Sequence, residues 1–208
     1  MPLLKINNEE DFILGIWKVE EDESTLISML NESDSYTQEL SQFNSSSRRI
    51  EWLAVRVLLQ NISKGCRIMY QESGRPFIED YSYNISISHT CGYVAVILHS
   101  TSEVGVDIEH YSTRVNKVIA RFIRMDESPS YYKGDVTWSN LLHWSAKETA
   151  FKILDSENVD FLNHLFIQPF HTTEKGMFIL KEFRTEKKES LNIHYEVYSD
   201  FVITWCVK

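Results

Sequence analysis

The clearest pattern in the chain is an alternation of apolar and polar residues over its last segments. Residues 191–197 and 201–207 are apolar at every second position, and Ser199-Asp200 lies between them. Because strand side chains point alternately to opposite faces, this pattern predicts a two-stranded hairpin with one buried face. An apolar stretch at 12–19 predicts another strand, before a helix that opens at Ser24 with Ser or Asp as its N-cap.

Helical spacing of apolar residues marks three further segments. The spacing predicts a helix from Ser47, a second over residues 115–122 and a third over residues 141–154. The second helix would carry basic residues beside its apolar stripe: Arg114, Lys117, Arg121 and Arg124. Residues 128–140 contain proline and glycine, which predicts a loop before the third helix.

The middle of the chain has the pattern of short strands joined by turns. Residues 72–76 predict a turn, because glycine tolerates positive φ and proline fixes its own φ. We expect strands at 85–87, 93–98 and 103–109, paired in one small, mainly antiparallel sheet. Both halves combine a long helix with hairpin strands, so the sequence predicts an α+β fold of two similar lobes that meet near residue 103.

Composition and charge restrict the class of protein. The 208 residues are 43% hydrophobic and 25% charged, which is typical of a globular chain and not of a disordered or fibrous one. The net charge of −9 argues against a nucleic-acid partner, because neutralising phosphates needs a basic surface. The three cysteines form no C-x-x-C pair, so we expect reduced thiols. With no apolar run of ~18–20 residues and no signal-peptide pattern, we expect a cytoplasmic protein without a membrane partner.

Two segments carry candidate chemistry. Asp107 and Glu109 stand two residues apart, so on a strand both carboxylates face one side and offer the oxygen ligands that Mg²⁺ prefers. Two solvated acids at a strand end would give the same pattern. Glu148 and Lys152 stand four residues apart and share a helical face with Trp144. A surface ion pair beside a buried tryptophan would explain this second segment as well.

Taken together, the two segments resemble the signature motifs of the 4'-phosphopantetheinyl transferase superfamily, in its larger, surfactin-synthetase-activating type. That type has a Gly-(Val/Ile)-Asp-x-Glu strand, then a Trp-(Ser/Thr)-x-Lys-Glu-x-x-x-Lys helix, and two lobes of similar fold. The chain contains both motifs unbroken, in residues 105–109 and 144–152.

The resemblance extends over most of the chain. Residues 74–76 are similar to the family's Gly-Lys-Pro turn, with arginine in place of lysine, and residues 86–90 to its Ser-His-Ser segment, with threonine in place of the last serine. Residues 56–59 resemble its Gly-Arg-x-Leu-Leu helix, although valine stands where glycine is usual. Residues 121–127 resemble its Arg-Phe-Phe-x-x-x-Glu stretch. No departure removes a proposed metal ligand or base.

The resemblance implies both an architecture and a reaction. Two lobes related by pseudo-twofold symmetry would each hold a small, mainly antiparallel sheet packed on a long helix. Residues 1–103 would contact the nucleotide of coenzyme A, and residues 104–208 would carry the metal and catalytic motifs. The reaction would move 4'-phosphopantetheine from coenzyme A, as substrate, to a serine of an apo acyl carrier or peptidyl carrier protein, releasing 3',5'-ADP.

The resemblance also implies a role for each matching residue. Mg²⁺, or Mn²⁺ in its place, would be held by three carboxylates: Asp107, Glu109 and Glu148. Coenzyme A would be contacted by a set of mostly polar residues: Arg56, Arg75, Pro76, Ser88, His89 and Lys152. Lys152 would act near the pyrophosphate and Glu148 as general base, with Glu127 as the second choice. The basic stripe is expected to dock an acidic carrier protein, and two lobes in one chain lead us to expect a monomer.

Two other interpretations stay open at this point. A catalytically silent homologue that binds coenzyme A or a carrier protein would keep the fold without the turnover. A metal-dependent hydrolase would use the same carboxylates on another phosphate ester, although it would not explain the Gly-Arg-Pro and Ser-His segments.

Overall fold

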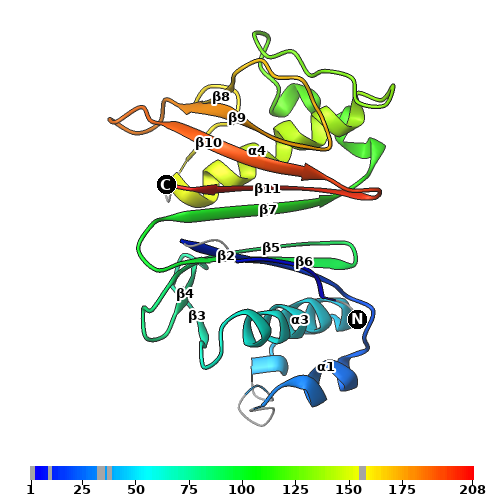
Figure 1. Ribbon diagram of the computed structural model, residues 1–208, viewed down its shortest axis with the longest axis vertical. Helices are drawn as coiled ribbons and strands as arrows, with labels where there is room; N and C mark the ends of the chain where they lie inside the picture. Colours follow the sequence, from blue (N-terminus) through cyan, green and yellow to red (C-terminus); the bar gives the residue numbers. More distant parts are fainter. Residues whose placement is uncertain (1–2, 9–10, 32–35, 37–38, 155–157) are drawn as a thin grey trace. The chain divides into compact units, whose positions relative to one another are not determined.

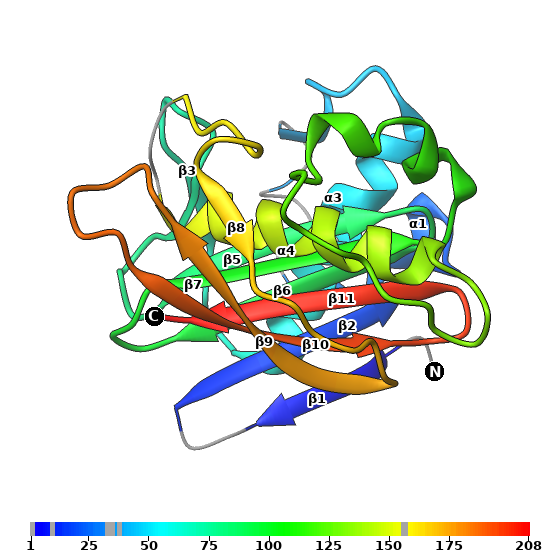
Figure 2. The same cartoon turned by 90° about the horizontal axis from the view of Figure 1, so that it is seen from above.

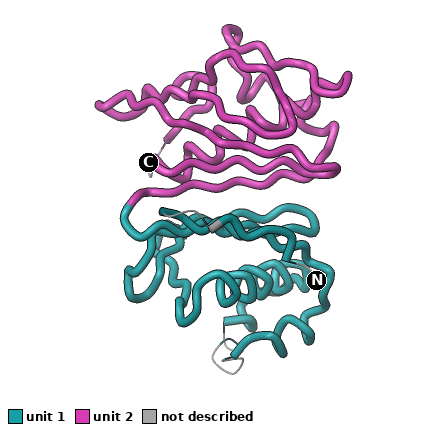
Figure 3. Tube along the Cα trace, in the orientation of Figure 1, with its two compact units in different colours: residues 1–101 teal, residues 102–208 magenta. Residues whose placement is uncertain are grey.

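The chain folds into two compact units, residues 1–101 and residues 102–208 (Figure 3). Each unit contains an antiparallel sheet and a long helix, so the α+β class is as predicted (Figure 1). The pseudo-twofold relation between the lobes stays a prediction. The computed structural model describes residues 3–8, 11–31, 36, 39–154 and 158–208.

Unit 1 is built on a four-stranded antiparallel sheet of order β1-β2-β6-β5. Its strands are β1 (Leu3–Asn8), β2 (Phe12–Lys18), β5 (Asn84–Thr90) and β6 (Tyr93–His99). Helix α3 (Ser46–Ile62) packs on β2 and β6, and α1 (Glu23–Met29) packs on α3. Apolar side chains between the helix and the sheet, among them Leu58 and Val96, form the core of this unit.

Local sequence explains where these elements begin and turn. The Asp22 side chain accepts a hydrogen bond from the backbone N of Thr25 at 2.8 Å, which caps α1. The predicted turn at 72–76 joins β3 (Ile68–Tyr70) to β4 (Pro76–Ile78), and Gly74 in it has a φ of +84°. The turn and an aspartate N-cap are therefore confirmed, although α1 starts at Glu23 and not at Ser24.

Unit 2 is built on a five-stranded antiparallel sheet of order β7-β11-β10-β9-β8 (Figure 2). Its strands are β7 (Val104–His110), β8 (Leu165–Ile167), β9 (Lys175–Glu182), β10 (Ser190–Val197) and β11 (Phe201–Val207). Helix α4 (Thr137–Leu154) packs on β7, β11 and β10. Strands β10 and β11 pair antiparallel, as the alternation predicts. Only β10 buries a single face, whereas β11 is buried on both faces from Phe201 to Cys206.

The prediction that residues 103–109 pair with the strands at 85–98 is wrong. Strand β7 pairs with β11, where Glu109 stands opposite Val202, and both strands belong to unit 2. Alternating or apolar patterns identify a strand, but they do not say which other strand supplies its hydrogen-bond partners.

The prediction of one helix over residues 115–122 is also wrong. The segment forms two short 3-10 helices, η1 (Thr113–Lys117) and η2 (Ile119–Arg121), separated by Val118 with a φ of −123°. The Asn116 side chain forms hydrogen bonds with Thr137 and Asn140, and these bonds hold the segment against α4.

The four basic residues of the expected stripe therefore do not share one helical face. Arg124 follows both 3-10 helices, and its guanidinium donates to Asp126 at 2.8 Å and to the Leu162 carbonyl at 2.9 Å. The next helix, α4, starts at Thr137 and not at residue 141, because the Asp135 side chain accepts from the Thr137 backbone N at 2.8 Å.

Two further features bear on the class of protein. Within the described ranges, no helix is long and apolar enough to cross a membrane. The three cysteines, Cys66, Cys91 and Cys206, are free thiols.

Candidate active site

Gly105 allows α4 to pass very close to β7. A Cβ added to Gly105 would lie 2.5 Å from the Thr149 carbonyl oxygen and 2.7 Å from Ile153 Cγ1, closer than real Cβ atoms come. The helix is also bonded to β11, because the Ser145 and Thr149 hydroxyls hydrogen-bond with the Thr204 hydroxyl at 2.9 and 2.7 Å. The glycine of the strand motif thus sets how near the helix motif lies to the sheet.

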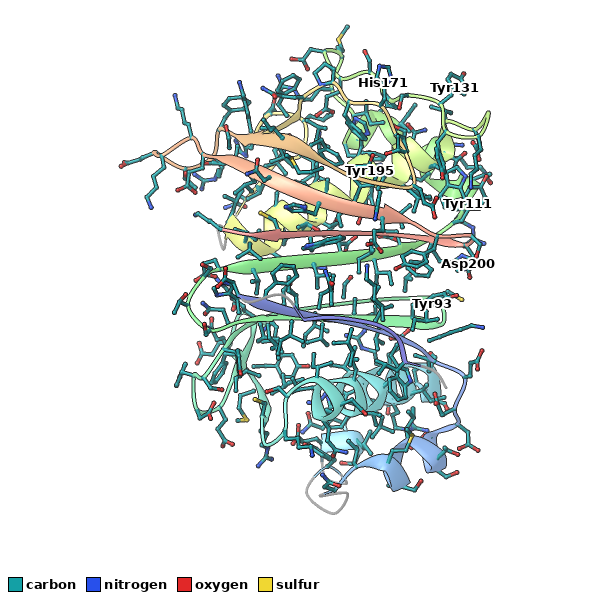
Figure 4. The ribbon with its side chains drawn as sticks, in the orientation of Figure 1. Tyr93, Tyr111, Tyr131, His171, Tyr195 and Asp200 are labelled. Carbon is teal, nitrogen blue, oxygen red and sulfur yellow. The ribbon has the colours of Figure 1, made fainter. Side chains whose placement is uncertain are left out.

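The ends of these elements are held together as well. The Tyr111 backbone N donates to the Asp200 carbonyl at 2.7 Å, which ties the end of β7 to the start of β11, and Figure 4 shows both residues at the same end of unit 2. The Tyr111 hydroxyl donates to Asp135 at 2.7 Å, just before α4. Tyr111 therefore fixes the end of β7 to the start of β11 and to the residues before α4.

Asp107 and Lys152 form an ion pair where α4 crosses β7. Lys152 Nζ lies 2.9 Å from Asp107 Oδ1 and 2.8 Å from the Val106 carbonyl oxygen. The Asp107 side chain is only 6% exposed, whereas Lys152 is 25% exposed. The lysine therefore anchors its amine on β7 while part of the side chain stays accessible.

Glu109 and Glu148 share the electrostatic environment of Asp107. Burial raises the pKa of Glu109 to about 7, and the negative charge of Asp107 acts in the same direction. Burial and the charge of Asp107 likewise raise the pKa of Glu148 to about 7. Trp144 Nε1 donates to Glu109 Oε1 at 2.7 Å and partly offsets the shift. The three predicted ligands thus form one cluster of interacting carboxyl groups.

The chemistry of this cluster fits a hard divalent cation. All three side chains offer carboxylate oxygens, which Mg²⁺ prefers. Burial is the main cause of both raised pKa values, and the charge of Asp107 raises them further by more than the charge of Lys152 lowers them. The described part of the chain contains no group of three His, Cys, Asp or Glu residues already arranged around one ion position. An ion there would compete with Lys152 and Trp144 for the oxygens of Asp107 and Glu109.

A buried ion pair lies on the inner side of α4. Lys147 Nζ is 2.9 Å from Glu127 Oε2 and 2.5 Å from the Phe122 carbonyl oxygen, and both charged side chains have 0% exposure. Glu127 also accepts from the backbone N atoms of Ile167 at 2.7 Å and Arg124 at 2.9 Å. Buried charges persist only when paired and hydrogen-bonded, so this pair fixes the segment after η2 against α4 and β8.

These contacts argue against the prediction of Glu127 as a second general base. A proton acceptor must come within hydrogen-bond reach of the substrate hydroxyl, and Glu127 is enclosed with both oxygens already bonded. Lys147 was not among the predicted site residues. It lies four residues after His143 and three before Ala150, so it shares their helical face, and the structure shows that this face is buried.

In unit 1, His89 lies against the first turns of α3. Arg48 Nη1 is 2.7 Å from His89 Nε2, and Glu51 Oε2 is 3.4 Å from His89 Nδ1. An arginine can only donate, so Nε2 accepts and the ring proton belongs on Nδ1, facing Glu51. Arg48 and Glu51 were not among the predicted site residues, because nothing in the sequence connects them to a histidine on β5.

The other predicted cofactor contacts in unit 1 differ in exposure. Arg75 and Pro76 lie half-buried at the β3–β4 turn, and Ser88 is buried on β5. Arg56 is only 4% exposed, with its guanidinium over the Trp52 ring. A direct contact of Arg56 with coenzyme A, as predicted, does not fit this placement.

Comparison with known protein families gives one further observation. Residues 103–206 match the family model of the 4'-phosphopantetheinyl transferase superfamily, and this range is half of the chain. The range contains Asp107, Glu109, Glu148 and Lys152. Comparison with curated proteins gives no match. The matched range coincides with the unit in which these four side chains meet, and the chain belongs to the 4'-phosphopantetheinyl transferase superfamily.

Proposed function

We propose that the protein transfers the 4'-phosphopantetheine group of coenzyme A to a serine of an apo acyl carrier or peptidyl carrier protein, as an enzyme of the surfactin-synthetase-activating type. Membership of the superfamily supports transferase activity. The observation that carries the proposal is the cluster of Asp107, Glu109 and Glu148 beside Lys152, held by the crossing of α4 over β7.

The proposed reaction is a phosphoryl transfer. The carrier serine oxygen forms a bond to the phosphorus next to the pantetheine, and the bond from that phosphorus to the oxygen of 3',5'-ADP breaks. The serine proton goes to Glu148, directly or through a water molecule. Glu148 is only partly buried, so a carrier hydroxyl or a water molecule can come within hydrogen-bond reach of its carboxylate.

The charges of the reacting diphosphate need matching charges in the site. Asp107, Glu109 and Glu148 would hold Mg²⁺ or Mn²⁺, which supplies neutralisation of the diphosphate oxygens when bound. Lys152, the most accessible cation of the cluster, would leave Asp107 and bind a diphosphate oxygen. Its hydrogen bond to the Val106 carbonyl oxygen would keep the amine close to the cluster, which is the positioning that such transfers depend on.

Residues of unit 1 would bind the nucleotide part of coenzyme A. Arg75 and Pro76 at the β3–β4 turn, with Ser88 and His89 on β5, are the proposed contacts. The guanidinium of Arg75 presents a planar fork of donors that suits a phosphate group. Arg48, which lies within hydrogen-bond distance of His89, would add its positive charge to that of Arg75 for binding the nucleotide. A cytoplasmic location and a monomeric state stay predictions.

The test is the intact mass of apo carrier proteins after incubation with the enzyme, coenzyme A and Mg²⁺. We expect one phosphopantetheine group added per carrier serine, with 3',5'-ADP released in equal amount. The Asp107→Asn variant should lose this activity, and Glu186→Gln, an exposed change in the same unit, should keep it. Nucleotide release without carrier modification would show a hydrolase, and neither product with any carrier of the panel would show a silent binding protein.

A further inference from the structure

A small cavity lies in unit 1 between the C-terminal half of α3 and the loop that leads to β3. Its volume is about 100 Å³, and residues from several segments line it: Leu30, Tyr36, Arg56, Gln60, Cys66 and Arg67. A water molecule needs only about 10–15 Å³ by this kind of measure, so the cavity has room for a small polyatomic ion. Its lining does not include Arg75, Ser88 or His89, so it is separate from the proposed nucleotide contacts.

Two arginines bring unsatisfied donors to this cavity. Arg56 is 4% exposed, and its Nη1 donates to the Trp52 carbonyl at 3.1 Å. Its Nε and Nη2 atoms are buried and make no hydrogen bond with any residue that the structure describes. The same is true of Nε of Arg67. Buried donors of this kind almost always have a partner in folded proteins.

Within the described residues, the two arginines of the cavity share one carboxylate. Glu39 is shared between the two arginines, with Oε2 at 3.7 Å from Arg56 Nη2 and Oε1 at 3.3 Å from Arg67 Nη2. Among the side chains that the structure describes here, one carboxylate therefore faces two guanidinium groups. Burial lowers the pKa of Arg56 although Tyr70 and Glu39 act in the opposite direction, so desolvation of this cation exceeds the compensation that its neighbours provide.

The walls of the cavity are fixed in place by other contacts. The Gln60 side chain donates to the Met29 carbonyl and accepts from the Asn31 backbone N, both at 3.0 Å. This links α3 to the segment after α1. The Arg56 guanidinium is held over the Trp52 ring. The donors are thus presented by a preorganised site, which lowers the entropic cost of binding.

We propose that this cavity binds a tetrahedral oxyanion of the phosphate class, through Arg56 and Arg67. Guanidinium groups match phosphate oxygens in geometry and make charge-assisted hydrogen bonds with them. Two arginines that approach from a helix and a loop offer donors in different directions, as a tetrahedral acceptor requires. The anion would be inorganic phosphate or the terminal phosphate of a larger molecule.

The test uses the full-length protein with inorganic phosphate alone, without Mg²⁺, coenzyme A or carrier protein. Binding is followed by isothermal titration calorimetry and by ³¹P line broadening, with KCl added to keep ionic strength equal. We expect saturable binding that Arg67→Gln weakens at least about tenfold, as the loss of a charge-assisted bond implies. Glu39→Gln should tighten binding several-fold, because it removes the carboxylate that competes for both arginines.

Controls separate this site from the proposed nucleotide contacts. Arg67 is 40% exposed, so its variant should fold, and far-UV circular dichroism checks this. Arg75→Gln should leave phosphate binding unchanged. Competition by phosphoserine would show that the cavity takes a terminal phosphate, and its absence that it takes the free ion.

Two results would overturn the proposal. One is the absence of saturable phosphate binding; the other is binding that Arg75→Gln removes and Arg67→Gln leaves intact. Because the assay contains neither coenzyme A nor carrier protein, its failure says nothing against the proposed transferase function.

Discussion

Removing the negative charge of Glu148 should stabilise the metal-free protein at neutral and alkaline pH. Burial and the charge of Asp107 raise the pKa of Glu148 from 4.5 to about 7. Between pH 4.5 and about pH 7, Glu148 therefore holds a proton in the folded state that it has lost in the unfolded state. Stability present at low pH is therefore lost as the pH rises from 4.5 through 7, because the folded protein must then keep an ionised carboxylate in the cluster. Glutamine at this position has no charge to bury.

The size of the effect follows from the shift in pKa. At about 1.4 kcal/mol per pH unit, a rise from 4.5 to about 7 corresponds to about 3 kcal/mol in the free energy of unfolding. Partial solvent access and coupling with Asp107 and Glu109 reduce this to about 1–2 kcal/mol. In a chain of this length the melting temperature of Glu148→Gln should rise by about 2–8 °C above pH 8.

The assay is urea unfolding in EDTA from pH 4.5 to pH 8.5, with Glu186→Gln as the exposed control. The difference between Glu148→Gln and the wild type should be small near pH 4.5 and reach its full size above pH 8. The variant should also lose phosphopantetheine transfer, so stability and activity change in opposite directions. Equal stability of variant and wild type at pH 8.5 would refute the argument that Glu148 is held ionised at a cost.

Further predictions concern the contact of α4 with β7, the two lysines of α4, the carboxyl cluster and the basic residues of the 3-10 helices. Gly105→Ala should destabilise the protein by about 1–3 kcal/mol, as overpacking does, and lower kcat, because α4 must move away from β7; calorimetry and turnover check this. Lys147→Met should cost about 3–5 kcal/mol in urea unfolding by leaving Glu127 buried and unpaired. Lys152→Met should reduce kcat and cost less stability than Lys147→Met, because Lys152 is 25% exposed while Lys147 is fully buried. Divalent-ion affinity, measured by calorimetry, should rise from pH 6 to pH 8, because binding displaces protons from the two glutamates with pKa values of about 7. Replacing Lys117 and Arg121 by glutamate should slow association with an acidic carrier and weaken its salt dependence in stopped-flow measurements.

Much of the fold could be predicted because many elements have a periodic burial pattern. The hairpin of β10 and β11 alternates between buried and exposed side chains over its first strand. In α3 every residue from Trp52 to Leu59 is buried, so there the spacing of apolar residue types and not the burial marked the helix. The partner of β7 could not be predicted, since it lies at the far end of the chain and pairing leaves no local signal. Val115 and Phe122 are spaced as in an α-helix, but the segment forms two 3-10 helices. The hydrogen bond from Asn116 to Thr137, far along the chain, could not be read from that spacing.

The candidate site shows the same division. Motif spacing brought Asp107, Glu109, Glu148 and Lys152 into one hypothesis, and the structure places them in one electrostatic cluster. Motif spacing did not reveal that Arg56 is buried over Trp52. The other residues around Arg56, which are Tyr36, Glu39 and Arg67, come from other segments of the chain. Roles that depend on exposure or on a partner distant in sequence can therefore be assigned only from the structure.

The most direct test of the account is a crystal structure of the protein with coenzyme A and Mn²⁺, read from the anomalous signal of the metal. We predict a single strong peak within coordinating distance of Asp107, Glu109 and Glu148 and of the coenzyme A diphosphate, with Lys152 on a diphosphate oxygen. A metal peak elsewhere on the chain, or a diphosphate bound away from these carboxylates, would contradict it.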